Sequence, residues 1–212
     1  MKNPKDIVRE GYDQVSLAYR GNEMDTSDEI YQQYKAWTDE ILFSLKKDSS
    51  VLDLGCGCGL PSTKLLSKTF NVIGVGISPV QIRRAKNLVP NATFVCGDMC
   101  KLEFDKEKFE AIVSFHAIIH VPEKEQPELL SRIWQWLKPE GYFLFSAGDT
   151  KWTGREENWL GVEGGNMYWS HADKETYLHW LKMSGFDVLW DRFIPDGPGG
   201  HVLFFAKKNE NR

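Results

Sequence analysis

The sequence predicts an α/β domain with a mainly parallel sheet. Short apolar runs of strand length alternate with helix-like segments throughout the 212 residues, and this alternation is typical of parallel βαβ units. The first apolar run passes into a glycine-rich loop and then into a helix, as in many such units. Because neither an internal repeat nor a linker interrupts the alternation, we expect one domain over residues 1–212.

The N-terminal part is predicted to be helical. Residues 1–20 have the periodicity of an amphipathic helix with Tyr12 on its apolar face. A second helix is expected over residues 26–47, opened by Thr26 or Ser27 as the capping residue.

Seven strand-like runs follow, and most are joined by predicted helices. Ser78 suits the cap of the helix after the second run, and Pro79 suits its first position. Residues 148–170, rich in Trp and Gly, are expected to be irregular, and a Gly/Pro turn over 195–200 precedes the last strand. The predicted strands cover residues 51–54, 72–75, 93–96, 111–115, 142–146, a run beginning at 187–190, and 201–206; the helices cover 60–68, 79–88, 122–137 and 173–185.

Composition and charge argue against several classes of function. Hydrophobic residues make up 42% and charged residues 26%, which is typical of a soluble globular protein. The net charge of −4, without a Lys/Arg block, disfavours a nucleic-acid-binding face. Residues 1–6 lack the apolar run of a signal peptide, and no apolar stretch has the length of a membrane span. We therefore expect a cytoplasmic monomer or homodimer without nucleic-acid or membrane partners.

The four cysteines do not predict a metal site. Cys56, Cys58, Cys96 and Cys100 form no CxxC pair and match no zinc spacing, and a reducing compartment disfavours a structural disulfide. Cys56 and Cys58 lie between glycines, so we interpret them as small residues of a tight loop.

The loop after the first strand carries the first sign of a ligand. Glycines let the backbone approach a ligand closely, and a helix that follows them offers free N–H groups. A dinucleotide fingerprint has glycines at its first, third and sixth positions. Here Gly55, Gly57 and Gly59 occupy the first, third and fifth, and no Gly-Lys-Ser/Thr follows as in a P-loop. The spacing favours a different adenosine-bearing ligand.

Several motifs together resemble the class I S-adenosylmethionine-dependent methyltransferases. DLGCGCG at 53–59 looks like their first motif, GDM at 97–99 like their acidic motif, and LKPEG at 137–141 like the turn before their fifth strand. FHAIIHVP at 115–122 resembles the small-molecule members of the ubiquinone and menaquinone methyltransferase-like branch. Tyr12-Asp13 with Tyr19 is similar to their N-terminal helix, which covers the cofactor.

The resemblance implies both a fold and a function. The fold is a Rossmann-like seven-stranded sheet of six parallel strands and one antiparallel strand, with helices on both faces. Residues 1–47 are expected to be a helical cover and residues 148–170 an inserted lid. The expected reaction is methyl transfer from S-adenosyl-L-methionine to an O-, N- or S-nucleophile of a small molecule, by in-line displacement. Nucleic-acid methylation is disfavoured because no Asn/Asp-Pro-Pro-Tyr-like motif follows the fourth strand.

The resemblance also assigns cofactor contacts. Asp53 is expected to organise the first loop and reach the methionine amine, Gly55 and Gly57 to lie against the amino-acid part, and Asp98 to accept from the adenine amino group beside Met99. The cofactor-binding residues predicted in this way are Tyr19, Asp53, Gly55, Cys56, Gly57, Gly59, Gly76, Ile77, Ser78, Gln81, Asp98, Met99 and Phe115.

One position departs from the family pattern. Members usually carry Asp or Glu at the end of the second strand to hold the ribose hydroxyls, and this chain has Gly76 there. Ser78 or Gln81 could substitute in part. The departure leaves open an alternative function, a non-catalytic pseudo-methyltransferase that acts as a ligand-binding or regulatory module.

The acceptor is expected at the carboxyl ends of the strands, where open α/β sheets bind ligands. His120 and His116 follow the fourth strand there and are the candidate bases, since histidine titrates near neutral pH. An alternative role for His120 is to cap or orient the next helix. The predicted acceptor-binding residues are Tyr12, Trp152, Trp159, Tyr168, Trp169, His171 and His201.

Overall fold

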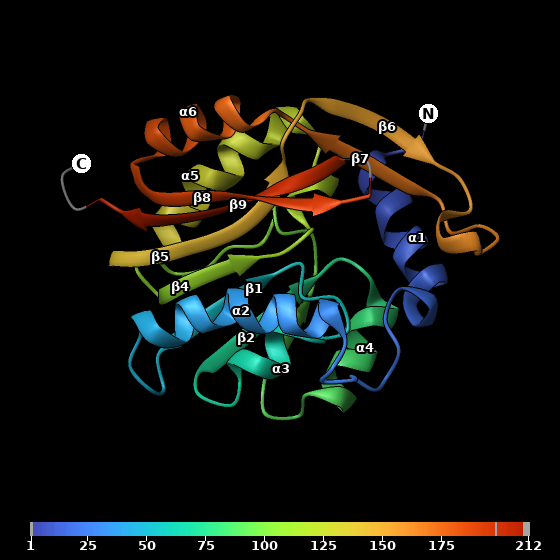
Figure 1. Ribbon diagram of the computed structural model, residues 1–212, viewed down its shortest axis with the longest axis horizontal. Coiled ribbons are helices and arrows are strands. Elements are labelled where there is room, and N and C mark those ends of the chain that lie inside the picture. Colours follow the sequence, from blue (N-terminus) through green and yellow to red (C-terminus); the bar gives the residue numbers. More distant parts are fainter. Residues whose placement is uncertain (1, 198, 210–212) are drawn as a thin grey trace.

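Seven strands form one mixed sheet in the order β3-β2-β1-β4-β5-β9-β8 (Figure 1). The computed structural model describes residues 2–197 and 199–209; Met1, Pro198 of the predicted turn and residues 210–212 lie outside the described part. The strands are β1 (Ser50–Leu54), β2 (Asn71–Gly76), β3 (Thr93–Cys96), β4 (Phe109–Ser114), β5 (Leu137–Gly148), β8 (Phe186–Asp196) and β9 (Gly199–Lys208).

The pairing confirms the predicted topology. β3, β2, β1, β4 and β5 run parallel to one another, whereas β9 is antiparallel to both β5 and β8. Six strands are therefore parallel and β9 is the antiparallel one. The connections reverse direction between β1 and β4, and open α/β sheets bind ligands at such a point.

Helices cover both faces of the sheet because its strands are apolar on both sides. On one face, α5 (Gln126–Trp136) and α6 (Lys174–Ser184) bury residues such as Leu130 and Tyr177 against Leu52 and Phe143. On the other, α2 (Glu29–Ser44) and α3 (Ser62–Leu66) pack Trp37 and other residues onto the sheet. The helix α4 (Pro79–Leu88) lies beside α3 in Figure 1 and is capped by Ser78 as predicted.

The helix α1 (Pro4–Tyr19) lies at the end of the sheet next to a hairpin of β6 (Trp152–Glu156) and β7 (Met167–His171) (Figure 1). The contact is close: a Cβ on Gly11 of α1 would lie 2.0 Å from the Asn166 carbonyl oxygen. The roles of residues 1–47 as a cover and 148–170 as a lid stay predictions.

Several local predictions differ from the structure. Residues 137–141, expected as a turn, belong to β5, and the expected turn over 195–200 is shortened because β8 ends at Asp196 and β9 begins at Gly199. Residues 148–170 contain this antiparallel hairpin and the short helix η3 (Trp159–Gly161) instead of being irregular. The cap of α2 is Asp28, whose Oδ1 accepts from the Ile30 N–H. The hydroxyl of Ser27 donates to Asp25 instead. The helix expected over 122–137 is divided into η2 (Glu123–Glu125) and α5.

Within residues 2–197 and 199–209, we find no helix with the length and apolarity of a membrane span. The same residues contain no group of three or more His, Cys, Asp or Glu side chains placed to hold a metal ion.

Candidate functional site

A cavity lies at the carboxyl ends of β1, β2, β3 and β4, under α1. It brings together residues that are far apart in the sequence, from Lys5 to Val121. Of the predicted cofactor-binding residues, those that line it are Tyr19, Gly55, Gly57, Gly76, Ile77, Ser78, Gln81, Asp98, Met99 and Phe115.

The glycine loop forms the floor of this cavity in a conformation that favours glycine. Gly55, Gly57 and Gly59 have φ angles of 84°, 54° and 81°, a region that other L-residues rarely adopt. The N–H groups of Gly55 and Cys56 both donate to the Val75 carbonyl, which ties the loop to β2. A Cβ on Gly57 would meet nothing within 4 Å, so its backbone faces open space.

Asp53, Cys56 and Gly59 do not line the cavity. Asp53 is buried, and its Oδ2 accepts hydrogen bonds from Ser62 Oγ at 2.8 Å and Thr63 Oγ1 at 2.6 Å. Cys56 packs in a small apolar cluster, and a Cβ on Gly59 would lie 2.9 Å from Val89. These bonds join Asp53 to the first residues of α3. Its expected roles in organising the loop and in contacting a methionine amine both stay predictions.

Asp53 should make stability depend on pH. Burial raises its pKa from 3.8 to about 6, against the opposing effect of the two hydroxyl donors. The folded state therefore holds a proton that the unfolded state releases above pH 3.8, so stabilisation by this group is complete below that pH and is lost as the pH rises through 6. Two pKa units correspond to a free-energy difference on the order of 3 kcal/mol.

We expect the unfolding free energy of the wild type, minus that of Asp53→Asn, to fall by about this amount between pH 4 and 7. Urea unfolding of the ligand-free proteins measures the difference. A difference that stays flat across this range would mean that Asp53 does not change its protonation there.

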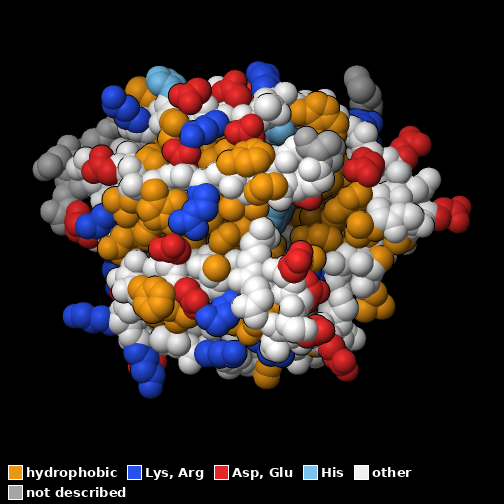
Figure 2. All heavy atoms as spheres, viewed as in Figure 1, with side chains coloured by type: hydrophobic (Ala, Val, Ile, Leu, Met, Phe, Trp, Pro, Cys, Tyr) orange, Lys and Arg blue, Asp and Glu red, His pale blue; other side chains and the backbone are white. Residues whose placement is uncertain are grey.

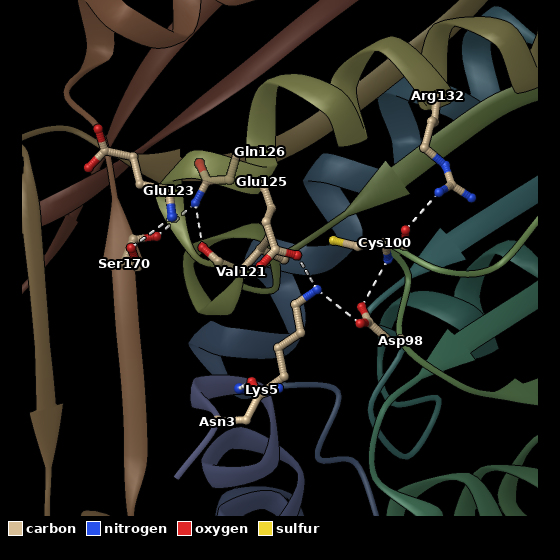
Figure 3. A network of polar contacts seen from close by, with 10 residues as sticks. All are labelled: Asn3, Lys5, Asp98, Cys100, Val121, Glu123, Glu125, Gln126, Arg132 and Ser170. Atoms are coloured by element: carbon tan, nitrogen blue, oxygen red, sulfur yellow. Dashed lines mark hydrogen bonds and ion pairs between the residues drawn. The ribbon is translucent and has the colours of Figure 1, made fainter. Parts of the chain in front are cut away.

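Asp98 lines the first cavity, and an ion pair with Lys5 joins it to α1 (Figure 3). Its Oδ1 accepts from the Cys100 N–H at 2.9 Å, and its Oδ2 lies 2.9 Å from the Lys5 ammonium. Lys5 also pairs with Glu125 at the start of α5. The ammonium therefore joins α1 to two other parts of the chain and compensates the charge of Asp98.

A second cavity adjoins the first and is lined by aromatic rings together with the polar side chains of Arg20, Glu29, Gln33 and Asp196. The two share Tyr12, Tyr19, His116 and His120. In Figure 2 hydrophobic side chains surround a hollow right of the centre, between α1 and the ends of β8 and β9. Of the predicted acceptor-binding residues, those that line this second cavity are Tyr12, Trp159, Trp169 and His201.

His120 stands where the two cavities meet, with both ring nitrogens engaged. Nδ1 lies 2.7 Å from the Tyr168 carbonyl oxygen and must donate to it, since a carbonyl only accepts. In the neutral ring Nε2 then accepts from the Tyr12 hydroxyl at 2.9 Å. Burial lowers the pKa of His120 to about 4, despite the Tyr168 hydrogen bond. The ring is therefore neutral at pH 7, and its two bonds do not include a cap of α5.

His116 is held differently. Its φ angle of 51° is uncommon for a residue other than glycine, and its backbone N–H donates to Ser146 Oγ. Its ring lies 4.9 Å from that of His201. Burial first, then the neighbouring histidines, lowers its pKa to about 3.

The remaining predicted acceptor-binding residues belong to the hairpin but line neither cavity. Trp152 is exposed and pairs with His171 across the hairpin, at ring centroids 6.1 Å apart. Neither residue lines the two cavities described here, and Tyr168 contributes its backbone carbonyl to His120. The prediction that Trp152, Tyr168 and His171 contact the acceptor therefore has no support from this geometry.

Several lining residues were not predicted. Lys5 and Val8 of α1 reach the first cavity, and Arg20 and Tyr34 line the second. The amphipathic pattern indicated which face of α1 is apolar, but no sequence signal showed that Lys5 would reach Asp98.

Comparisons with known proteins agree with this geometry. The glycine loop, β2, Asp98 and the segment after β4 all lie in a stretch that matches one family. Residues 51–141 match the methyltransferase domain family. The matched stretch ends before the hairpin and the last two strands, so most residues of the second cavity lie outside it.

Individual relatives are similar over much of the chain. The sterol 24-C-methyltransferase of Aspergillus fumigatus is 29% identical over 167 residues, 73% of this chain and 44% of that protein. The chain thus spans less than half of that relative's length. Among solved structures, phosphoethanolamine N-methyltransferase 2 of Haemonchus contortus superposes with a TM-score of 0.77 at 18% identity, over 99% of this chain and 61% of that one. Magnesium protoporphyrin IX methyltransferase of Synechocystis, with bound SAH, gives 0.74 at 15% identity, over 98% and 100%.

These structural likenesses show the Rossmann-like fold of methyltransferases. The relative compared by sequence is a sterol methyltransferase by name. The ubiquinone and menaquinone branch that residues 115–122 resemble therefore stays a prediction.

Proposed function

We propose that the chain transfers a methyl group from S-adenosylmethionine to a small, largely apolar molecule. The observation that carries the proposal is the junction of two cavities, one floored by the glycine loop of a methyltransferase domain and one lined by aromatic rings. A methyl donor in the first and an acceptor in the second would meet beside His120. Such positioning supplies much of the rate of a transfer reaction.

The residues present fit S-adenosylmethionine. The open space beside Gly57 admits the amino-acid part against backbone, and the Asp98 carboxylate is an acceptor for the adenine amino group. Val8, Ile77 and Met99 give this part of the cavity apolar walls suited to a flat ring. When bound, S-adenosylmethionine supplies a methyl group that its positive sulfur activates for displacement.

Tyr12 and His120 are placed to move a proton of the acceptor. The acceptor would give a proton to the Tyr12 oxygen, and Tyr12 would at the same time pass its own hydroxyl proton to His120 Nε2. Because the pKa of His120 is about 4, the ring takes this proton only as positive charge develops on the acceptor. Among the described residues, the His116 ring has no such pair of hydrogen-bond partners, so we assign the role of base to His120.

The same pKa favours particular acceptors. A methylated hydroxyl, or a carbon centre that becomes cationic, is strongly acidic and would release its proton to such a ring. An ammonium group, with a pKa near 10, would not. The rings of Tyr19, Trp159 and Trp169 favour an apolar acceptor, and the sterol methyltransferase named above supports the same class.

The test has two stages. Calorimetric titration should show binding of S-adenosylmethionine, and a concentration of 100 times the dissociation constant should raise the unfolding free energy by about 2.7 kcal/mol. A panel of hydroxylated and unsaturated apolar metabolites is then screened for release of S-adenosylhomocysteine. No thermal shift at millimolar cofactor would overturn the proposal. Binding without turnover on any acceptor would favour the ligand-binding module instead.

Asp98→Ala should weaken binding of S-adenosylhomocysteine about tenfold or more, since a hydrogen bond to a charged group contributes roughly 1.5–3 kcal/mol. The protein should stay folded, because Lys5 keeps Glu125 as its partner. Glu125→Ala is the matched control: it removes the other carboxylate from Lys5 but does not alter the cavity lining. Equal affinities for the two variants would remove Asp98 from the site.

A further inference from the structure

The side chain of Gln81 is buried without any hydrogen-bond partner. Gln81 lies in the first turn of α4, is 2% exposed, and lines the first cavity. Neither Oε1 nor Nε2 has a partner among the described residues. Burying an unpaired amide is costly, so a polar ligand in the cavity is the expected compensation.

The other residues after β2 that could bind a polar ligand are less suitable, because their side chains already have hydrogen-bond partners or carry no polar group. Ser78 Oγ accepts from the Gln81 N–H at 3.0 Å and donates to Asp13 Oδ1 at 2.5 Å, so its donor is used. Gly76 has no side chain, and a Cβ there would lie 3.0 Å from Ile82 Cδ1. Among the described lining residues Asp98 is the one carboxylate, and it lies beyond β3, bound to Lys5 and the Cys100 N–H.

We propose that the Gln81 amide binds the ribose hydroxyls of the cofactor, in place of the acidic residue usual after β2. This inference rests on the proposed function, because it assumes an adenosine-bearing ligand in the first cavity. An amide suits two neighbouring hydroxyls: Oε1 accepts from one and Nε2 donates to the oxygen of the other. It does so without adding a second buried charge to a cavity that already holds Asp98.

A double-mutant cycle tests the contact directly. The ligands are S-adenosylhomocysteine and its 2′-deoxy analogue, and the proteins are wild type and Gln81→Leu. In wild type, loss of the hydroxyl should weaken binding about tenfold. Gln81→Leu should weaken binding of S-adenosylhomocysteine by about 10- to 100-fold, and the missing hydroxyl should then cost less than about twofold.

Gln126 provides a matched control because it is a buried glutamine with a satisfied amide. Its Nε2 donates to three carbonyls and its Oε1 accepts from the Tyr177 hydroxyl. Gln126→Leu should lower the thermal midpoint of the ligand-free protein and leave affinity per folded molecule within about threefold. Gln81→Leu should show the opposite pattern, an equal or higher midpoint and weaker binding.

The outcomes separate the two proposals. Wild type that binds no S-adenosylhomocysteine overturns the proposed function. Wild type that binds both ligands equally, or a deoxy penalty that persists in Gln81→Leu, overturns the role of Gln81 and leaves the proposed function standing. The wild-type comparison needs no variant, so equal binding of the two ligands overturns the role of Gln81 even where Gln81→Leu does not fold.

Discussion

Replacing His120 by alanine should lower turnover by about 10²–10⁴-fold, the usual cost of removing a general base. The affinity for S-adenosylhomocysteine should change by less than about threefold, because Tyr12 and the glycine loop still line the first cavity. Tyr12→Phe should lower turnover as well, since the hydroxyl joins the acceptor side to Nε2. Rates are measured with the acceptor found in the panel, per folded molecule.

His179→Ala is the control for this experiment, since His179 is exposed on α6 and lies outside both cavities. Its turnover should match that of the wild type. A purely structural His120 would give a different result: the protein would lose on the order of 1–3 kcal/mol from the unpaired Tyr12 hydroxyl and Tyr168 carbonyl, with near-normal turnover. That result would move the search for the base to His116.

The sheet could be predicted because buried parallel strands are short, continuous apolar runs. Residues 72–75 and 142–145 show such runs, and the structure places β2 and β5 there. The glycine loop was recognisable since positive φ angles leave little choice but glycine. The hairpin was not recognised, because residues 152–171 lack the strict alternation that marks a half-buried strand.

The site was harder to predict than the fold because it depends on side-chain direction. Topology placed residues 148–171 near the rim, but successive residues of a strand face opposite sides. Trp169 reaches the second cavity, while Tyr168 beside it contributes only its backbone to His120. Likewise, spacing could not choose between Ser78 and Gln81. The hydrogen bonds of Ser78 make that choice.

The two glycines at the floor of the first cavity should respond differently to alanine. A Cβ on Gly55 would lie 2.1 Å from the Ala117 Cβ, and φ there is 84°. Overpacking and backbone strain each cost roughly 1–3 kcal/mol. Gly55→Ala should therefore lose about 2–6 kcal/mol of unfolding free energy, a large part of the stability of a typical domain, and binding should fall with it.

Gly57→Ala should instead show a loss of binding with a smaller loss of stability than Gly55→Ala. Its φ of 54° lies in the left-handed region that alanine tolerates at roughly 1–2 kcal/mol, and no protein atom lies within 4 Å of the new Cβ. The methyl group would occupy space that the proposal assigns to the cofactor, so affinity for S-adenosylhomocysteine should fall at least tenfold. Urea unfolding and calorimetry on both variants measure the two effects. Gly57→Ala that binds as tightly as the wild type would place the cofactor away from this loop.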